Sequence, residues 1–123
     1  MSATLLMKVT GVLELLTGLA LLSAPSLTIG MLLGERPASP SAIVVARVAG
    51  SALLAIGLIC RPKGRGEGAP PPAGLLAGLL AYNAAVAVLL AHAALASGLR
   101  GVALWPVVVA HSALGLWCLA CMR

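Results

Sequence analysis

The sequence predicts an all-α, polytopic membrane protein with four transmembrane helices in an up-down-up-down bundle. Hydrophobic residues make up 61% of the 123 residues and charged residues only 9%, whereas soluble domains carry about 25% charged residues. Four apolar stretches fill most of the chain, and each is close to the roughly 20 helical residues that cross a bilayer. We expect a single transmembrane domain over residues 1–123, with spans at about residues 5–24, 41–60, 74–97 and 102–122.

The segments between the spans are short, and each has a distinct composition. Residues Ser26–Gly34, after Pro25, are apolar but too few to cross, so we expect a short interfacial helix on the outer surface. Pro40 suits the first turn of the second span. Residues 61–73 are rich in glycine and proline, which is typical of a linker. Gly98–Gly101 allows only a tight connection, which favours antiparallel neighbours.

The basic residues predict the orientation in the membrane. Cytoplasmic segments of membrane proteins are enriched in Lys and Arg. One side of the predicted bundle holds Lys8, Arg61, Lys63, Arg65 and Arg123, and the other holds Arg36 and Arg100. We therefore expect a bacterial inner (plasma) membrane protein with both termini and the 61–73 linker in the cytoplasm. The basic residues are not interleaved with aromatic ones, so the net charge of +5 does not indicate a nucleic-acid partner.

Small residues within the spans are expected to bring helices close together, because packing drives helix association in lipid. The candidates are three pairs, Gly11 with Gly18, Gly50 with Gly57, and Gly74 with Gly78.

Two charged residues lie deep inside predicted spans, where an ionised side chain costs about 2.5–3.5 kcal/mol on insertion scales. They are Glu14 and Arg47, and His111 lies at a similar depth. Glu14 also argues that the first span is not a cleaved signal peptide. Each of these residues shares a helical face with others of its span: Glu14 with Thr10, Thr17 and Gly18, Arg47 with Gly50, Ser51 and Leu54, and His111 with Gly115 and Cys118.

We therefore expect an intramembrane polar cluster of Glu14, Arg47 and His111. Three interpretations remain open. Glu14 and Arg47 neutralise each other and fix the helix register, or they line a cavity for a proton, an ion or a ligand. In the third, Arg47 extends its side chain to the outer headgroups.

The third span carries Tyr82, Asn83 and His92, each a candidate for a helix contact or a ligand. His92 is nine residues after Asn83, which puts it on the opposite face at about 100° per residue. One of the two is expected to face the bundle and the other a partner chain. A membrane histidine can ligate a tetrapyrrole, but nothing here requires one, and no cofactor is predicted.

The three cysteines are expected at the cytoplasmic boundary: Cys60 ends the second span, and Cys118 and Cys121 end the fourth. Three thiolates could bind a soft metal such as Cu(I), while buried cysteine also serves as a small apolar residue. Glycine-rich phosphate loops, HExxH sequences and Ser-His-Asp sets with supporting spacing are absent from the sequence. The sequence therefore gives no basis for assigning a catalytic residue, and an enzyme is the less favoured class.

The strings GVLELLTGLALL (Gly11–Leu22), APSLTIGMLLG and ARVAGSALLAIGL (Ala46–Leu58) resemble small bacterial four-helix membrane proteins near the DoxX-like group. This resemblance covers about half of the chain and implies four spans without a defined activity. The chain is also similar in length and span number to small multidrug-resistance transporters. Glu14, followed by Thr17, would correspond to their membrane glutamate, although their aromatic residues and Trp-Ala-Gly-type motif have no match here.

Three functions follow as expectations. The first is a non-catalytic accessory or scaffold subunit of a larger membrane assembly, with other membrane subunits or further copies of the chain as partners within the lipid bilayer. The second is a small proton- or cation-coupled carrier that uses Glu14. The third is a cofactor-ligating subunit of a membrane enzyme, through His92 or His111.

Overall fold

A computed structural model describes residues 2–37, 39–61 and 71–123 of the chain. The described residues form five helices: α1 (Ala3–Ser23), α2 (Pro25–Leu33), α3 (Pro40–Ile59), α4 (Ala73–Ala96) and α5 (Leu104–Met122). All but α2 are long and apolar enough to cross a membrane. The all-helical class is confirmed, and each long helix begins and ends within two residues of its predicted span. The predicted 61–73 linker falls mainly on residues 62–70, outside the described ranges.

Local sequence accounts for where the helices begin and end. The hydroxyl oxygens of Ser2 and Ser39 accept hydrogen bonds from backbone N–H groups in the first turns of α1 and α3, which satisfies donors that a helix start leaves unpaired. Proline occupies the first position of both α2 and α3, where its missing N–H does no harm. Gly34 ends α2 with a φ of 83°, a backbone conformation that glycine adopts without strain.

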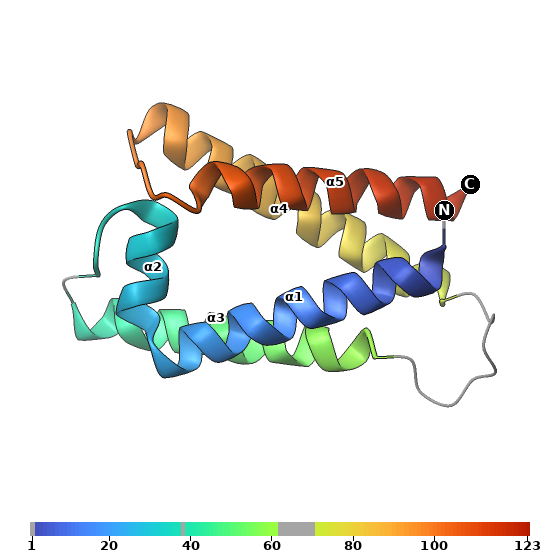
Figure 1. Cartoon of the computed structure of the whole chain (residues 1–123), viewed down its shortest axis with the longest axis horizontal. Helices are drawn as coiled ribbons and strands as arrows, with labels where there is room; N and C mark the ends of the chain where they lie inside the picture. Colours follow the sequence, from blue (N-terminus) through green and yellow to red (C-terminus); the bar gives the residue numbers. More distant parts are fainter. Residues whose placement is uncertain (1, 38, 62–70) are drawn as a thin grey trace.

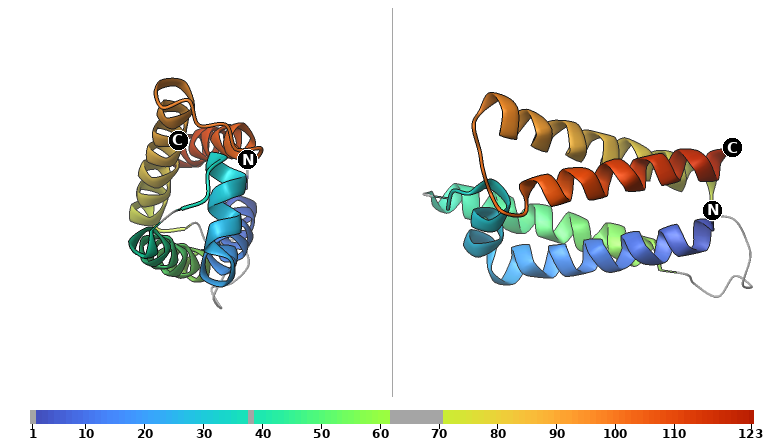
Figure 2. Two further views of the ribbon diagram at one scale, coloured as in Figure 1. Left: turned by 90° about the vertical axis from the view of Figure 1, so that its left-hand side faces the viewer. Right: turned by 45° about the horizontal axis from the view of Figure 1, so that its top comes forward.

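The four long helices are arranged as two pairs. Helix α1 packs along α3, and α4 packs along α5, whereas contact between the two pairs is sparser. Figures 1 and 2 show the pairs lying beside each other, with both chain termini at one end of the molecule. The other end holds α2 and the segment that joins α4 to α5 (Figure 1).

Glycine makes the α1–α3 pair unusually close. A Cβ atom added to Gly18 would lie 2.7 Å from the carbonyl oxygen of Gly50, and one added to Gly57 would lie 3.0 Å from the carbonyl oxygen of Gly11. The first distance is shorter than real Cβ contacts and the second lies at their lower limit, so the two backbones are in direct contact at Gly11–Gly57 and Gly18–Gly50. The expectation that Gly11 with Gly18, and Gly50 with Gly57, bring helices close together is confirmed.

The third glycine pair behaves differently. A Cβ atom added to Gly74 or Gly78 of α4 would meet no atom within 4 Å, and both residues are exposed. Among the described residues, no helix packs against them. Helix α4 approaches α5 elsewhere, where a Cβ atom added to Gly115 would lie 3.7 Å from Cβ of Asn83.

The two pairs are joined at both ends of the molecule. At one end the Ala103 N–H donates to the Met31 carbonyl over 2.9 Å, and Gly101 packs directly on the Leu32 carbonyl at the end of α2. At the other end a buried apolar cluster includes residues from α1, α4, α5 and the end of α3: Leu6, Met7, Cys60, Leu76, Leu79, Leu114 and Cys118. The outer faces expose aliphatic side chains, as a lipid-facing surface does.

We predict that Gly18→Ala destabilises the protein by roughly 1–3 kcal/mol, because the new methyl group is forced against the α3 backbone. Gly78→Ala is the matched control, since its methyl group meets no atom within 4 Å. Thermal unfolding in detergent, followed by circular dichroism, measures both. Equal melting temperatures for the two variants would contradict the proposed backbone contact.

Candidate functional site

Glu14 is buried where the two helix pairs meet. It lies on α1 with only 3% of its surface exposed. The hydroxyl of Tyr82, on α4, donates a hydrogen bond to its Oε2 over 3.0 Å. Among the described residues, Glu14 bonds to this phenol and to no basic side chain. A buried carboxyl group without a basic partner is therefore the central feature of the site.

The expected pairing of Glu14 with Arg47 is wrong in this structure. Arg47 is exposed on α3, and the cluster of Glu14, Arg47 and His111 does not assemble around it. The contacts of Gly50 and Gly57 with α1 fix the rotation of α3. The neighbouring Ala46 is buried, and a step of one residue turns a helix by about 100°, which carries Arg47 off that face.

His111 and Asn83 form the second half of the site, between α5 and α4. Asn83 is fully buried, and its Nδ2 donates to the Leu79 carbonyl over 2.7 Å. Its Oδ1 lies 2.8 Å from Nδ1 of His111. Because a carbonyl can only accept, the Leu79 contact fixes the amide orientation, and Oδ1 must accept from His111. The neutral ring therefore carries its hydrogen on Nδ1, which leaves the lone pair on Nε2.

Tyr82 connects the two halves. Its ring meets the His111 ring edge to face, with centroids 5.5 Å apart and planes at 82°. Glu14, Tyr82, His111 and Asn83 thus form one contiguous set from three helices, which we call the junction cluster. His111 belongs to this cluster, and Tyr82 is the partner of Glu14 in place of the expected Arg47.

The segment between α4 and α5 sets the depth of Asn83 relative to His111. Helix α4 has 24 residues and α5 has 19. The segment from Ser97 to Ala103 runs back along the molecule before α5 begins, as Figure 2 shows. The offset brings Asn83, 13 residues before the end of α4, level with His111, seven residues after the start of α5.

Asn83 and His92 of α4, which were expected on opposite faces of the helix, differ in their exposure. Asn83 is buried against α5, and His92 is exposed near the end of the helix. Whether a partner chain covers His92 stays a prediction.

Thr10 is a second buried polar residue of α1, one turn before Glu14. It has 0% exposure, and its Oγ1 has no hydrogen-bond partner among the described residues. Four other helical hydroxyls donate to the carbonyl four residues earlier, namely those of Ser23, Thr28, Ser51 and Ser112. The Thr10 hydroxyl does not do so, and its position beside Glu14 makes it part of the candidate site.

The cysteines gather at the end of the molecule that holds the termini. Cys60 and Cys118 are buried in the apolar cluster, and Cys121 packs against it. No disulfide joins any of the three. The described residues contain no group of three or more Cys, His, Asp or Glu side chains placed to hold a metal. These thiols lie among aliphatic side chains, as buried cysteine does when it acts as a small apolar residue.

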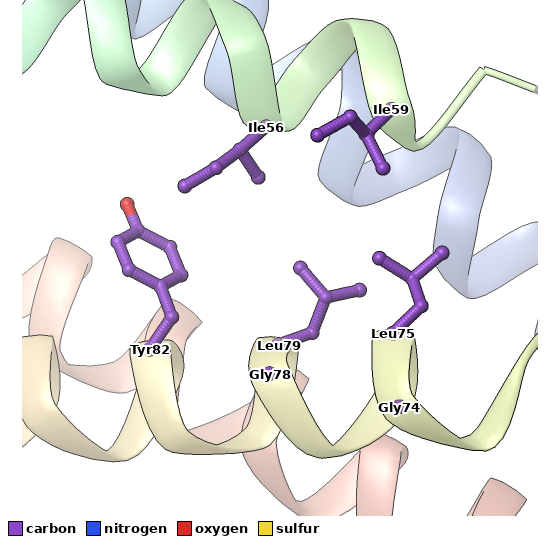
Figure 3. Close-up of a pocket in the computed structure, with 7 residues that line it drawn as sticks. All are labelled: Ile56, Ile59, Gly74, Leu75, Gly78, Leu79 and Tyr82. Carbon is purple, nitrogen blue, oxygen red and sulfur yellow. The ribbon is translucent and has the colours of Figure 1, made fainter.

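An apolar groove lies between α3 and α4 and reaches Tyr82. Its volume is about 270 Å³, and it is lined by Ile56, Ile59, Gly74, Leu75, Gly78, Leu79 and Tyr82. Figure 3 shows the tyrosine at one end of the row, with its hydroxyl beyond the aliphatic side chains. The exposed glycines of α4 thus border a groove that ends at the residue bonded to Glu14.

Comparisons with protein-family models, with curated proteins and with solved structures found no match for this chain. The junction cluster and Thr10, through their chemistry and geometry, therefore carry the evidence for function.

We predict that Tyr82→Phe destabilises the protein by roughly 1–3 kcal/mol, because it strands a buried carboxyl oxygen. In double-mutant cycles, Tyr82→Phe and Glu14→Ala should be non-additive, while Glu14→Ala and Arg47→Gln should be additive within about 0.5 kcal/mol. Chemical or thermal unfolding in detergent gives the four stabilities of each cycle. Strong coupling to Arg47 instead would restore the ion pair expected from the sequence.

Proposed function

We propose that this protein is a small membrane carrier in which Glu14 binds a proton or a cation. The observation that carries the proposal is the burial of Glu14 with one phenol, and no basic side chain among the described residues, as its partner. An ionised carboxylate without a counter-charge is costly inside a membrane. A bound proton or cation neutralises it, and exchange of one for the other couples their movements.

The arrangement of the helices supports a carrier as well. The α1–α3 pair is held by direct backbone contact, and α4 packs closely along α5. Glu14 belongs to one pair and Tyr82, Asn83 and His111 belong to the other. Each pair can then shift as a unit around the junction cluster, as alternating access requires. The groove beside Tyr82 adds an apolar approach to this junction.

We predict that acid-loaded proteoliposomes with a trapped pH dye become more alkaline when external sodium, potassium or tetraethylammonium chloride is added. Glu14→Gln should reduce the rate to that of protein-free vesicles, because the amide cannot exchange a proton for a cation. Glu35→Gln is the matched control, since Glu35 is exposed after α2, and it should keep the wild-type rate.

Two results would contradict the carrier. One is an unchanged rate in Glu14→Gln, and the other is the lack of a protein-dependent response to any of the three salts. The accessory or scaffold subunit would then be the favoured function. Arg47 and His92 support that second candidate, because both are ionisable and exposed on membrane-spanning helices, where such groups usually have a partner.

We also propose that both termini and residues 61–73 lie on the cytoplasmic side of a bacterial inner membrane, with α2 at the outer surface. The excess of Lys and Arg at that side supports this orientation, as does the position of both termini at one end of the molecule (Figure 1).

The orientation predicts that reporters fused at Gly66 and after Arg123 are both active in the cytoplasm. A reporter after Arg100, in the segment between α4 and α5, should behave in the opposite way. External activity at Gly66 or after Arg123 would overturn this topology.

A further inference from the structure

We infer that Thr10 and Glu14 together bind an alkali-metal cation, sodium or potassium, inside the bundle. The inference rests on the proposed carrier function and names the ion that Glu14 takes. It starts from the Thr10 hydroxyl, which is fully buried and has no hydrogen-bond partner among the described residues. A buried hydroxyl normally has a partner, and helical serine and threonine usually find one in the preceding turn. Thr10 instead keeps both its donor and its lone pairs unused beside a carboxyl group.

The helix geometry places the two oxygen groups within reach of a common ion. Thr10 and Glu14 are four residues apart on the buried face of α1, about 6 Å along the helix axis. Side chains in a helix lean toward its N-terminus, so the longer Glu14 side chain extends over the turn that carries Thr10. The two groups are not hydrogen-bonded to each other.

Tyr82 adds a third oxygen, which lies beside the Glu14 carboxyl group. Its hydroxyl hydrogen is given to Glu14, which leaves the phenolic lone pairs available to a cation. Carboxylate and hydroxyl oxygens suit hard cations, while the buried thiols of Cys60 and Cys118 suit soft ones. Water and backbone carbonyl oxygens would complete the coordination shell.

The charge of the site selects a monovalent ion. Glu14 supplies one negative charge, and no basic or further acidic side chain bonds to it among the described residues. A single positive charge makes the site neutral, whereas a divalent ion would leave a net charge inside the membrane. A proton on Glu14 would also neutralise the site, but with the two side chains placed as they are, without a hydrogen bond between them, it would leave the Thr10 oxygen without a partner. An alkali ion satisfies both residues.

Melting temperatures in detergent at constant ionic strength test the inference, with sodium chloride, potassium chloride and N-methylglucamine chloride as the three salts. We expect sodium or potassium to raise the wild-type melting temperature by roughly 3–8 °C over N-methylglucamine, since a bound ion stabilises the folded state. Thr10→Val and Glu14→Gln should lose this shift. Thr17→Val should keep it, because Thr17 lies on α1 but is exposed.

Direct binding of radioactive sodium or potassium to the wild-type protein provides a second measurement if Thr10→Val does not fold. Thr10→Ser retains the hydroxyl and should retain binding. No alkali dependence of the wild-type protein, or an undiminished shift in Thr10→Val, would overturn the ion site. The vesicle assay separates the two proposals: Glu14-dependent flux without alkali binding removes only the ion site. Thr10-dependent binding without flux removes only the carrier.

Discussion

The contact between the backbones of α1 and α3 determines how the rest of the molecule is arranged. Two glycines on each helix allow this contact, at Gly11–Gly57 and Gly18–Gly50. Because the backbones touch at two points seven residues apart, neither helix is free to rotate about its axis. The residues flanking the contact then have fixed directions. Glu14 is turned toward α4 and α5, where it meets Tyr82, and Arg47 is turned outward.

The packing of α4 against α5 depends on a polar contact as well as on a small residue. Asn83 uses its amide nitrogen on its own helix and its amide oxygen on His111 of α5. Gly115 gives the asparagine side chain room against α5. In lipid, where apolar side chains gain little by meeting each other, such a buried amide contributes to the choice of partner helix. The hydrogen bond from His111 to Asn83 also orients the imidazole ring, and this orientation allows the edge-to-face contact with the Tyr82 ring.

Much of the fold could be predicted from the sequence, because bilayer thickness and helix rise limit the choices. The four spans were located within two residues, as was the short helix after Pro25. The site was predicted less well. Glu14, Tyr82, Asn83 and His111 were all identified as candidates, yet the expected partner of Glu14 was Arg47. Opposite charges at similar depth indicate a pair only if both helices present them to each other.

The rotation of each helix about its axis depends on how the helices pack. The glycine spacing indicates that two helices pack closely, but it does not specify their rotation. The sequence pattern placed Thr10, Glu14, Thr17 and Gly18 on one face of α1. In the structure Thr10, Glu14 and Gly18 are buried, but Thr17 is exposed. The connection between α4 and α5 was expected to be a tight one over Gly98–Gly101, but it extends from Ser97 to Ala103. Nothing in the sequence indicates that the Thr10 hydroxyl would not donate a hydrogen bond to the carbonyl groups of the preceding helical turn.

The difference between the two kinds of contact bears on how the molecule could move. Within the α1–α3 pair, separation would break backbone contacts that only glycine permits. Between the pairs, the contacts are the Tyr82–Glu14 hydrogen bond, the apolar cluster at one end, and at the other end the backbone contacts of Gly101 and Ala103 with α2. A change in the charge of Glu14 alters the strength of the Tyr82–Glu14 contact, since a hydrogen bond to a charged acceptor is stronger than one to a neutral acceptor. In the proposed carrier, ion exchange at Glu14 would therefore act on the contact between the two pairs and not within either pair. The same binding event that neutralises the site would change how the two pairs sit against each other.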